Sequence, residues 1–257
     1  MHSTFVVHSK SEHLKPELEK LINNFAEVGE FVTHGERNVI KKVIINGKTF
    51  NIKSFKKPSF FQGLVYQFLR KSKAKRSFEY ASKLIECSIN TPYPIAYSEI
   101  FSFGLKESYY VSEHIDYDFD FRDLIHNPKY PNRVEILKQF TAFSFKLHEN
   151  NVNFLDHSPG NTLIKDRGES RYDFYLIDLN RMRFEPLSLD ERMKNLRRLW
   201  LSKTMVNIIA DEYATLDNIT FELAHASLSK HSRAFQKKVN SKKLRRKRRL
   251  KKKETRI

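Results

Sequence analysis

Three polar residues in the second half of the chain stand at intervals that limit what the chain can fold into. Asp156 and Asn161 are five positions apart, and an apolar run, Thr162 to Ile164, follows directly. Asp178 comes at the end of a second apolar run, Phe174 to Ile177. We therefore expect a loop with Asp156 and Asn161 before one strand, and Asp178 after the next strand.

This spacing suits phosphoryl transfer, which needs a hydroxyl held in line with a γ-phosphate and cations that neutralise the phosphate oxygens. A carboxylate at Asp156 can orient that hydroxyl, and the side-chain oxygens of Asn161 and Asp178 are hard ligands of the kind that Mg²⁺ prefers. Protein kinases have the same interval between their catalytic Asp and Asn. We predict a phosphotransferase that uses ATP and Mg²⁺. Because an isolated Asp-x4-Asn is common, and an Asp after a strand is often a turn former, the prediction depends on further motifs in kinase order.

A predicted strand upstream carries a candidate phosphate-binding lysine. Residues 49–55 alternate apolar and polar side chains, as a half-buried strand does. Within it, Lys53 takes the place of the kinase lysine that contacts the α- and β-phosphates; a surface lysine on a strand edge is the alternative. Asn46-Gly47 before the strand is typical of a hairpin turn. A nucleotide-covering loop is expected near Gly35. This loop has only one glycine, so it is a weak phosphate-binding motif.

A predicted helix follows. Residues 72–87 have apolar side chains at helical spacing and end before a proline. On this helix, Glu79 is the candidate for the glutamate that pairs with Lys53. Glu86 is its rival, and an exposed glutamate is the alternative for both.

Two further segments complete the order of elements. Residues 109–115 predict a buried strand leading into a hinge, where Glu113 and Ile115 would offer backbone groups to an adenine. Residues 132–149 carry a broad apolar stripe and predict a helix that leads into the Asp156 loop. The ordered set of elements is more specific than any single motif.

At this point the chain resembles the lipopolysaccharide kinases that phosphorylate 3-deoxy-D-manno-octulosonic acid (Kdo) or core heptose, which are small bacterial members of the protein-kinase-like superfamily. That family's patterns, His-x7-Asp-x4-Asn and Leu-Ile-Asp-[Phe/Leu]-[Asp/Asn]-Arg, match His148, Asp156 and Asn161 and then residues 176–181. The segments 73–79 and 89–95 are also similar to the family's helix and the strand after it. The resemblance covers residues 30 to 200, approximately.

The resemblance implies an α+β, bilobal protein-kinase-like fold, with a small antiparallel-sheet lobe over residues 1–115 and a mostly helical lobe over 116–229 that carries Asp156, Asn161 and Asp178. It implies transfer of phosphate from ATP to a sugar hydroxyl, with Kdo favoured, in inner-core lipopolysaccharide. The family usually has a His two residues before its catalytic Asp, and Phe154 stands there. That change removes a hydrogen bond that braces the loop but no catalytic group, so we expect an active enzyme.

The charge is concentrated at one end of the chain. Residues 230–257 hold 15 of the 47 basic residues and one of the 30 acidic residues, so the rest carries 32 basic against 29 acidic residues. Such a block cannot bury a core, and alone it is expected to stay extended by self-repulsion. Its start, Ala226 to Val239, could prolong a helix, whereas Lys242 to Lys253 is a polyelectrolyte expected to stay extended. Its predicted partner is an anionic membrane surface; nucleic acid is the less favoured alternative, and a tail that only aids solubility is another.

A second segment fits a membrane partner. Phe60 to Leu69 places aromatic and aliphatic side chains between basic clusters, which suits an interfacial helix; packing on the small lobe is the more frequent outcome for such a stripe. The single Cys87 and the absence of a long apolar run predict a cytoplasmic protein. The resemblance to lipopolysaccharide kinases implies in addition that the protein is peripheral at the inner membrane of a Gram-negative bacterium. Two alternatives remain: a protein or small-molecule kinase of the same fold, or a pseudokinase-like scaffold that binds RNA or a membrane. The oligomeric state is unknown.

Overall fold

The computed structural model describes residues 2–34 and 38–254. The chain divides into two compact units. The first contains residues 1–116 and 175–181, and the second contains 117–174 and 182–257. Each unit is described by itself.

The first unit is built on one six-stranded sheet in the order β1-β5-β6-β4-β3-β2. Neighbouring strands in the sheet run antiparallel. Its strands are β1 (His2–Val7), β2 (Glu30–His34), β3 (Asn38–Ile45), β4 (Lys48–Phe55), β5 (Pro94–Phe101) and β6 (Leu105–Glu113). Its helices are η1 (Ser9–Leu14), α1 (Lys15–Asn23), α2 (Phe60–Phe68) and α3 (Lys73–Glu86).

The predicted hairpin before Lys53 is confirmed. β3 pairs with β4 from Asn38 opposite Phe55 to Ile45 opposite Lys48. Asn46 and Gly47 connect the strands with φ of 50° and 76°. Asn and Gly tolerate such left-handed conformations best, and two of them in succession give the turn that matches the twist of the strands.

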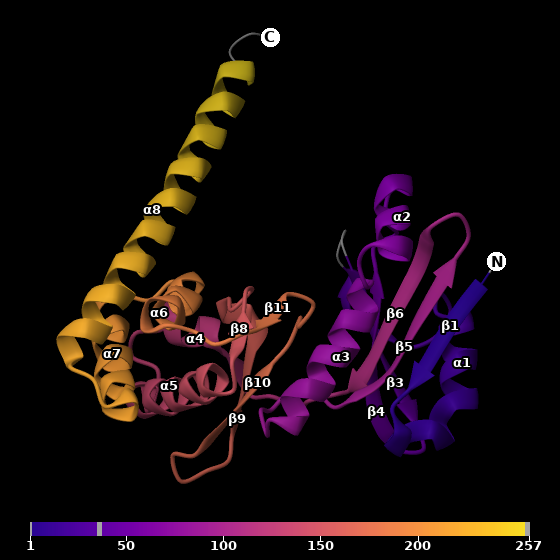
Figure 1. Ribbon diagram of the computed structural model, residues 1–257, viewed down its shortest axis with the longest axis horizontal. Coiled ribbons are helices and arrows are strands. Elements are labelled where there is room, and N and C mark those ends of the chain that lie inside the picture. Colours follow the sequence, from indigo (N-terminus) through magenta and orange to yellow (C-terminus); the bar gives the residue numbers. More distant parts are fainter. Residues whose placement is uncertain (1, 35–37, 255–257) are drawn as a thin grey trace. The chain divides into compact units, whose positions relative to one another are not determined.

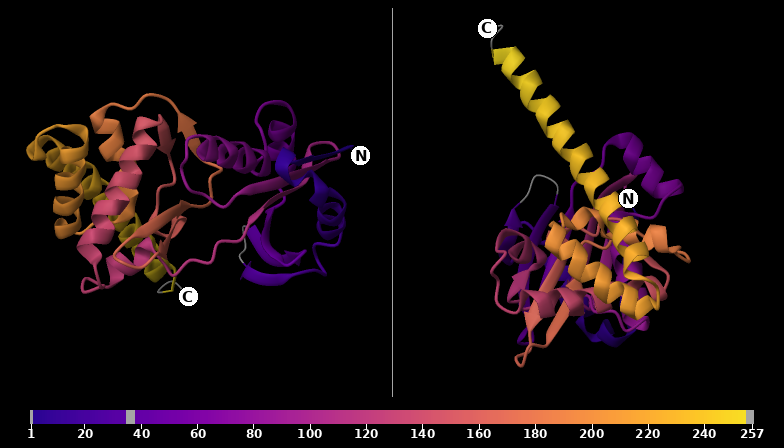
Figure 2. Two further views of the ribbon diagram at one scale, coloured as in Figure 1. Left: turned by 90° about the horizontal axis from the view of Figure 1, so that it is seen from below. Right: turned by 90° about the vertical axis from the view of Figure 1, so that its left-hand side faces the viewer.

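Alternation along β4 separates the two faces of this sheet. Phe50 and Ile52 are buried in a core that also contains Leu18 and Ile22 of α1. Lys53 therefore lies on the opposite face, the face on which the α3 residue Phe78 contacts Tyr97 of β5. Figures 1 and 2 show α1 and α3 on opposite sides of the sheet.

The second unit is mostly helical. Its helices are α4 (Phe121–His126), α5 (Arg133–Glu149), η2 (Pro159–Asn161), α6 (Leu189–Leu196), η3 (Arg197–Leu199), α7 (Lys203–Asp217) and α8 (Phe221–Glu254). Its short strands are β7 (Phe119–Asp120), β8 (Val152–Phe154), β9 (Thr162–Asp166), β10 (Tyr172–Leu176) and β11 (Met182–Phe184). The core joins α4, α5, α6 and α7, with Phe140 and Tyr213 among its fully buried side chains. An antiparallel sheet with helices confirms the α+β class.

The prediction that Lys242 to Lys253 would be extended is wrong, because these residues belong to α8, which Figure 1 shows as one continuous yellow helix. The helix starts on the core, where Ala224, Leu228 and Ser232 are buried. Nucleation is the costly step of helix formation, and Lys, Arg and Leu are good helix formers. A helix anchored by packing therefore continues through the basic sequence. The packed part also extends past residue 230, where we expected the tail to begin.

None of the described helices is both long enough and apolar enough to span a bilayer.

Candidate active site

The first unit brings together two of the predicted site residues. Lys53 Nζ donates a hydrogen bond to Asp178 Oδ1 at 2.7 Å. The Lys53 side chain is 13% exposed and that of Asp178 is 33% exposed, so the lysine is mostly shielded from solvent and the aspartate partly so. Asp178 has φ of 59°, a conformation that costs energy for a residue with a side chain and that is frequent at functional sites.

The segment that carries Asp178 is fixed to the first unit from both ends. Before it, Leu176 N–H donates to the carbonyl of Asn90 at 3.1 Å, and its own carbonyl accepts from Thr91 Oγ1 at 2.7 Å. After it, the carbonyl of Asn180 accepts from the buried Arg76 at 2.7 Å. We expected Asp178 with the helical lobe, but its segment, residues 175–181, belongs to the first unit.

Asp178 also has a polar partner within its own segment. Asn180 Nδ2 donates to Asp178 Oδ1 at 2.6 Å, so Oδ1 accepts from both Asn180 and Lys53.

The predicted Lys53–Glu79 pair is not formed within the described residues. Glu79 instead accepts two hydrogen bonds from Lys71 Nζ, at 2.9 and 2.8 Å. Lys71 follows α2 and is much closer along the chain than Lys53, so the glutamate is satisfied locally. The rival, Glu86, is exposed at the end of α3.

Besides Lys53, the α3 residue Lys73 interacts electrostatically with Asp178. Burial lowers the pKa of Lys73, and Arg181 lowers it further, while Asp178 acts in the opposite direction. Lys53 and Arg76 also lower this pKa. Positive charge is therefore concentrated around Asp178, as a site for a polyphosphate requires. The sequence reasoning missed Lys73, although its place at the start of a helix between other cations could have indicated it.

Of the predicted hinge residues, Glu113 ends β6. Its N–H donates to the carbonyl of Tyr93 at 2.9 Å, and the N–H of His114 donates to the carbonyl of Thr49 at 3.0 Å. Because the N–H of Glu113 is already bonded, only its carbonyl group is available for an adenine. Ile115 is half-buried, and its backbone groups remain the other predicted contacts. Gly35 lies outside the described residues.

In the second unit, the loop with Asp156 is held by short-range bonds. Asn161 Nδ2 donates to the backbone carbonyl of Asp156 at 2.9 Å. This bond closes the five-residue interval that the sequence shows. The Asp156 carboxylate forms an ion pair with Arg198 at 2.8 Å, with the Asp156 side chain 19% exposed. Sequence reasoning missed Arg198, which is 42 positions away and belongs to no motif that we used.

A buried network replaces the brace lost at Phe154. Asn195 of α6 donates to the carbonyl of Phe154 and to Asn153 Oδ1, both at 2.9 Å. Asn195 Oδ1 faces His157 Nδ1 at 3.0 Å and His148 Nε2 at 3.4 Å. Burial lowers the pKa of His157 to about 4 and that of His148 to about 3, so both rings are neutral at pH 7. Each neutral ring can then donate one N–H to the same amide oxygen.

The donor chemistry of the predicted metal ligands fits a hard cation. No group of three or more His, Cys, Asp or Glu side chains suited to a metal occurs within the described residues. Kinase sites do not require one, since phosphate oxygens and water complete the coordination of Mg²⁺. Asn161 uses its amide nitrogen for Asp156, which leaves the amide oxygen as the ligand atom. Asp178 contributes a carboxylate. Oxygen donors of these two kinds suit Mg²⁺ better than a softer metal.

Comparisons with known proteins show the family and the fold of the chain. A model of the lipopolysaccharide kinase (Kdo/WaaP) family matches residues 32–220. Among solved structures, the chain is similar to one described as WaaP in complex with acyl carrier protein, with a TM-score of 0.64 and 16% sequence identity. That match covers 91% of this chain and 98% of the other, and at this identity it shows a shared fold. No curated protein sequence matches the chain.

Proposed function

Because the chain belongs to the lipopolysaccharide kinase (Kdo/WaaP) family, we propose that it transfers the γ-phosphoryl group of ATP to a hydroxyl of an inner-core sugar, with Kdo as the favoured acceptor. The observation that carries this proposal is the Lys53–Asp178 pair at 2.7 Å, set among further cations. It supports the proposal because a lysine suited to bind phosphate contacts the carboxylate that the family pattern assigns to the metal.

In the first unit, Lys53 binds the α- and β-phosphates of ATP. The carbonyl of Glu113 and the backbone of Ile115 bind the adenine. Asp178 in the first unit and Asn161 in the second unit are each the residue whose side-chain oxygen would serve as a ligand of Mg²⁺. When bound, the ion neutralises charge on the β- and γ-phosphate oxygens. On nucleotide binding, Lys53 exchanges part of its contact with Asp178 for phosphate oxygens, which frees Asp178 Oδ1.

In the second unit, Asp156 accepts a hydrogen bond from the acceptor hydroxyl and aims its oxygen at the γ-phosphorus. The new bond joins that oxygen to phosphorus, the bond to the β,γ-bridging oxygen breaks, and ADP leaves. The hydroxyl proton passes to the Asp156 carboxylate. Arg198 acts as a positioning residue because its ion pair fixes the rotamer of that carboxylate. Most of the rate enhancement then comes from orientation and electrostatics.

The basic half of α8 supports a location at an anionic surface. From Lys242 to Arg249 the exposed side chains include seven of Lys or Arg, and each basic residue near an anionic membrane contributes about 1 kcal/mol. A lipopolysaccharide precursor at the inner leaflet of the cytoplasmic membrane would be reached from such a location. The WaaP match was solved with acyl carrier protein, so a carrier protein is a second candidate partner for this chain.

The test is transfer of labelled γ-phosphate from Mg-ATP to Kdo-lipid A by the wild type, by Asp156→Asn and by Asp211→Asn. Asp211 is exposed on α7 and serves as the matched control. We expect label on the sugar with the wild type and the control. Removal of a catalytic carboxylate should lower the rate by about 10²- to 10⁴-fold.

Two results would point elsewhere. ATP binding without transfer to Kdo-lipid A would indicate another acceptor, a heptose, a protein or a small molecule. If the protein does not bind ATP, or binds it equally well without Lys53, the proposal is contradicted. That result would favour a scaffold that works through its basic helix.

A further inference from the structure

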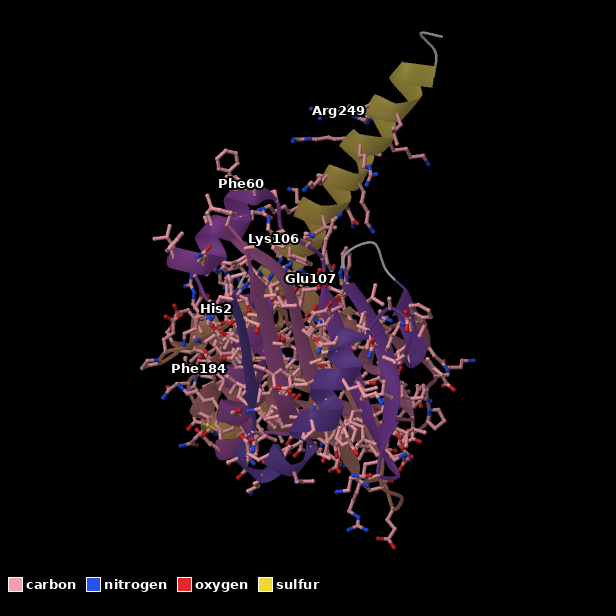
Figure 3. The ribbon with its side chains drawn as sticks, turned by 90° about the vertical axis from the view of Figure 1, so that its right-hand side faces the viewer. His2, Phe60, Lys106, Glu107, Phe184 and Arg249 are labelled. Carbon is pink, nitrogen blue, oxygen red and sulfur yellow. The ribbon has the colours of Figure 1, made fainter. Side chains whose placement is uncertain are left out.

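The helix α2 exposes apolar side chains that a soluble protein normally buries. Phe60, Phe61 and Phe68 are 59%, 78% and 72% exposed, and Val65 and Leu69 are 41% and 81% exposed. Residues 61, 65, 68 and 69 have the spacing of one helical stripe. This stripe faces solvent, so the alternative that it packs on the sheet is not what the structure shows. Figure 3 shows the Phe60 ring standing out from the helix.

A second element enlarges this apolar surface. Gly63 on the inner side of α2 meets the turn between β5 and β6 so closely that a Cβ added to it would lie 2.9 Å from the carbonyl oxygen of Leu105. A Cβ added to Gly104 would meet the backbone of Gly63 at the same distance. This contact brings the 85%-exposed Phe103 next to the helix. The docking patch, defined here as Phe60, Phe61, Val65, Phe68, Leu69 and Phe103, therefore spans two elements that are fixed to each other.

The patch has basic residues at both ends. Lys56 and Lys57 precede α2, Arg70 and Lys71 follow it, and all four are exposed. No acidic residue occurs between Lys48 and Glu79. Apolar side chains flanked by cations match the two layers of an anionic bilayer surface, which offers acyl chains beneath negatively charged headgroups.

A pocket continues the same chemistry. It has a volume of about 530 Å³ and lies between the end of α2 and the edge strand β1. Phe68 and Leu69 line it together with Arg70, Lys71 and Lys75. Cations and apolar side chains therefore line the same pocket. The one acidic side chain in the lining, Glu99, is 5% exposed.

We propose that the docking patch inserts into the headgroup region of an anionic lipid bilayer and that Arg70 and Lys75 bind lipid phosphate there, joined by Lys71 once lipid phosphate competes with Glu79 for its ammonium group. Membrane binding does not require the proposed function. Only its biological purpose, which is to bring the kinase to a glycolipid acceptor, rests on that function. The patch belongs to the unit that carries Lys53, so binding through it holds the nucleotide-binding sheet at the membrane surface.

The test is co-sedimentation of the full chain with vesicles of phosphatidylcholine alone and of equal parts phosphatidylcholine and phosphatidylglycerol. We expect binding to the mixed vesicles, and a loss of about tenfold or more in Phe60→Ser/Phe61→Ser, since two large apolar side chains no longer enter the bilayer. Val134→Ser/Leu223→Ser is the matched control, because Val134 and Leu223 are 54% and 57% exposed and lie outside the patch. This control should bind as the wild type does.

A second variant, Arg70→Gln/Lys71→Gln, separates headgroup binding from insertion. It should weaken binding to the mixed vesicles and leave the weaker binding to phosphatidylcholine unchanged. Equal binding of the mixed vesicles by the wild type and by Phe60→Ser/Phe61→Ser would overturn the proposal. The proposal would also be overturned if the wild type is a dimer, the serine variant is a monomer, and both bind vesicles equally. The patch would then join two copies of the chain.

The assay needs no catalysis, which keeps the two proposals apart. If the wild type sediments with vesicles but transfers no phosphate to Kdo-lipid A, the membrane inference stands and the acceptor is wrong. If transfer to detergent-dispersed Kdo-lipid A is normal in a serine variant that still sediments fully, the function stands and the membrane inference fails.

Discussion

Mild acid should destabilise the second unit through its two buried histidines. His148 accepts from or donates to Tyr213 at 2.8 Å and faces Asn195, which also bonds His157. With Asn195 Oδ1 receiving both ring N–H groups, His148 Nδ1 is the acceptor of the Tyr213 hydroxyl. Protonation would place a hydrogen on that nitrogen and a positive charge in a fully buried site. The native state therefore resists the proton that the unfolded chain takes up.

The magnitude follows from the pKa values. An unfolded histidine has a pKa near 6.5, whereas burial lowers these two to about 3 and about 4. Between those limits the unfolded state binds more protons, so the free energy of unfolding falls as the pH falls. From about pH 7 to about pH 5, each histidine contributes a loss of roughly 2 kcal/mol, and the pair about 4 kcal/mol. Above about pH 7 the contribution is fully present.

Trp200 provides the assay. It is the only tryptophan in the chain and lies in the second unit, where its ring contacts Phe235 of α8. Urea unfolding followed by its fluorescence at a series of pH values gives the slope directly. His157→Gln should lose about half of the pH dependence, whereas His126→Gln, at an exposed position on α4, should keep the wild-type slope.

Three carboxylates with lowered pKa values should contribute little to the change in stability between about pH 7 and about pH 5. The pKa values of Asp118, Asp190 and Glu191 are lowered mainly by hydrogen bonds, so their contributions are lost only at more acidic pH. A wild-type stability that is flat between about pH 7 and about pH 5, or a His157→Gln slope equal to that of the wild type, would refute the reasoning.

Three further outcomes are expected. Replacing Arg198 by Ala should lower kcat on the order of tenfold by loosening the catalytic carboxylate, with the KM for ATP unchanged and partial recovery in Arg198→Lys; steady-state kinetics decide, and an unchanged kcat contradicts the positioning role. Glu79→Gln should bind ATP as the wild type does, while Lys53→Met should not, measured by calorimetry; equal losses would restore the pair that we expected from sequence. Gly63→Ala should cost about 1–3 kcal/mol in stability by overpacking against the β5–β6 turn, with Gln62→Ala as the exposed control, and a melting temperature equal to that of the control would contradict the close contact.

Local patterns in the sequence predicted much of the first unit. Asn46-Gly47 determined a hairpin because few other residues adopt its left-handed turn, and the stripe on α3 marked a helix correctly. The Lys53–Glu79 pair failed for a different reason. A motif names the types of residue that meet but not their competitors, and Lys71 reaches the glutamate first. N-terminal strand β1 also went unpredicted, since nothing local shows that residues 2–7 pair with β5.

The bracing of the catalytic loop could not be predicted because it is tertiary. The sequence shows that Phe154 replaces a histidine, but not that Asn195 approaches from α6 to hold the same loop. Arg198 is equally remote from Asp156 along the chain. For α8 the error was one of energetics: a helix was considered for residues 226–239, but self-repulsion was expected to end it before Lys242, whereas the helix continues to Glu254.

The continuity of α8 makes its outer half a helix that responds to ionic conditions. Basic residues stand four apart at 242 and 246, 243 and 247, and 245 and 249, and like charges at that spacing destabilise a helix. Figure 3 shows Arg249 projecting from this stretch. A polyanion that neutralises these basic residues therefore removes their mutual repulsion and stabilises the helix. By the same linkage, a helix already formed binds the polyanion without first having to order its backbone. Lys243, whose ammonium group lies 5.5 Å from the Trp200 ring, stands where this outer half meets the packed core. Trp200 stands two residues after Arg198, the partner of Asp156, so the basic helix contacts the segment that holds the predicted catalytic carboxylate.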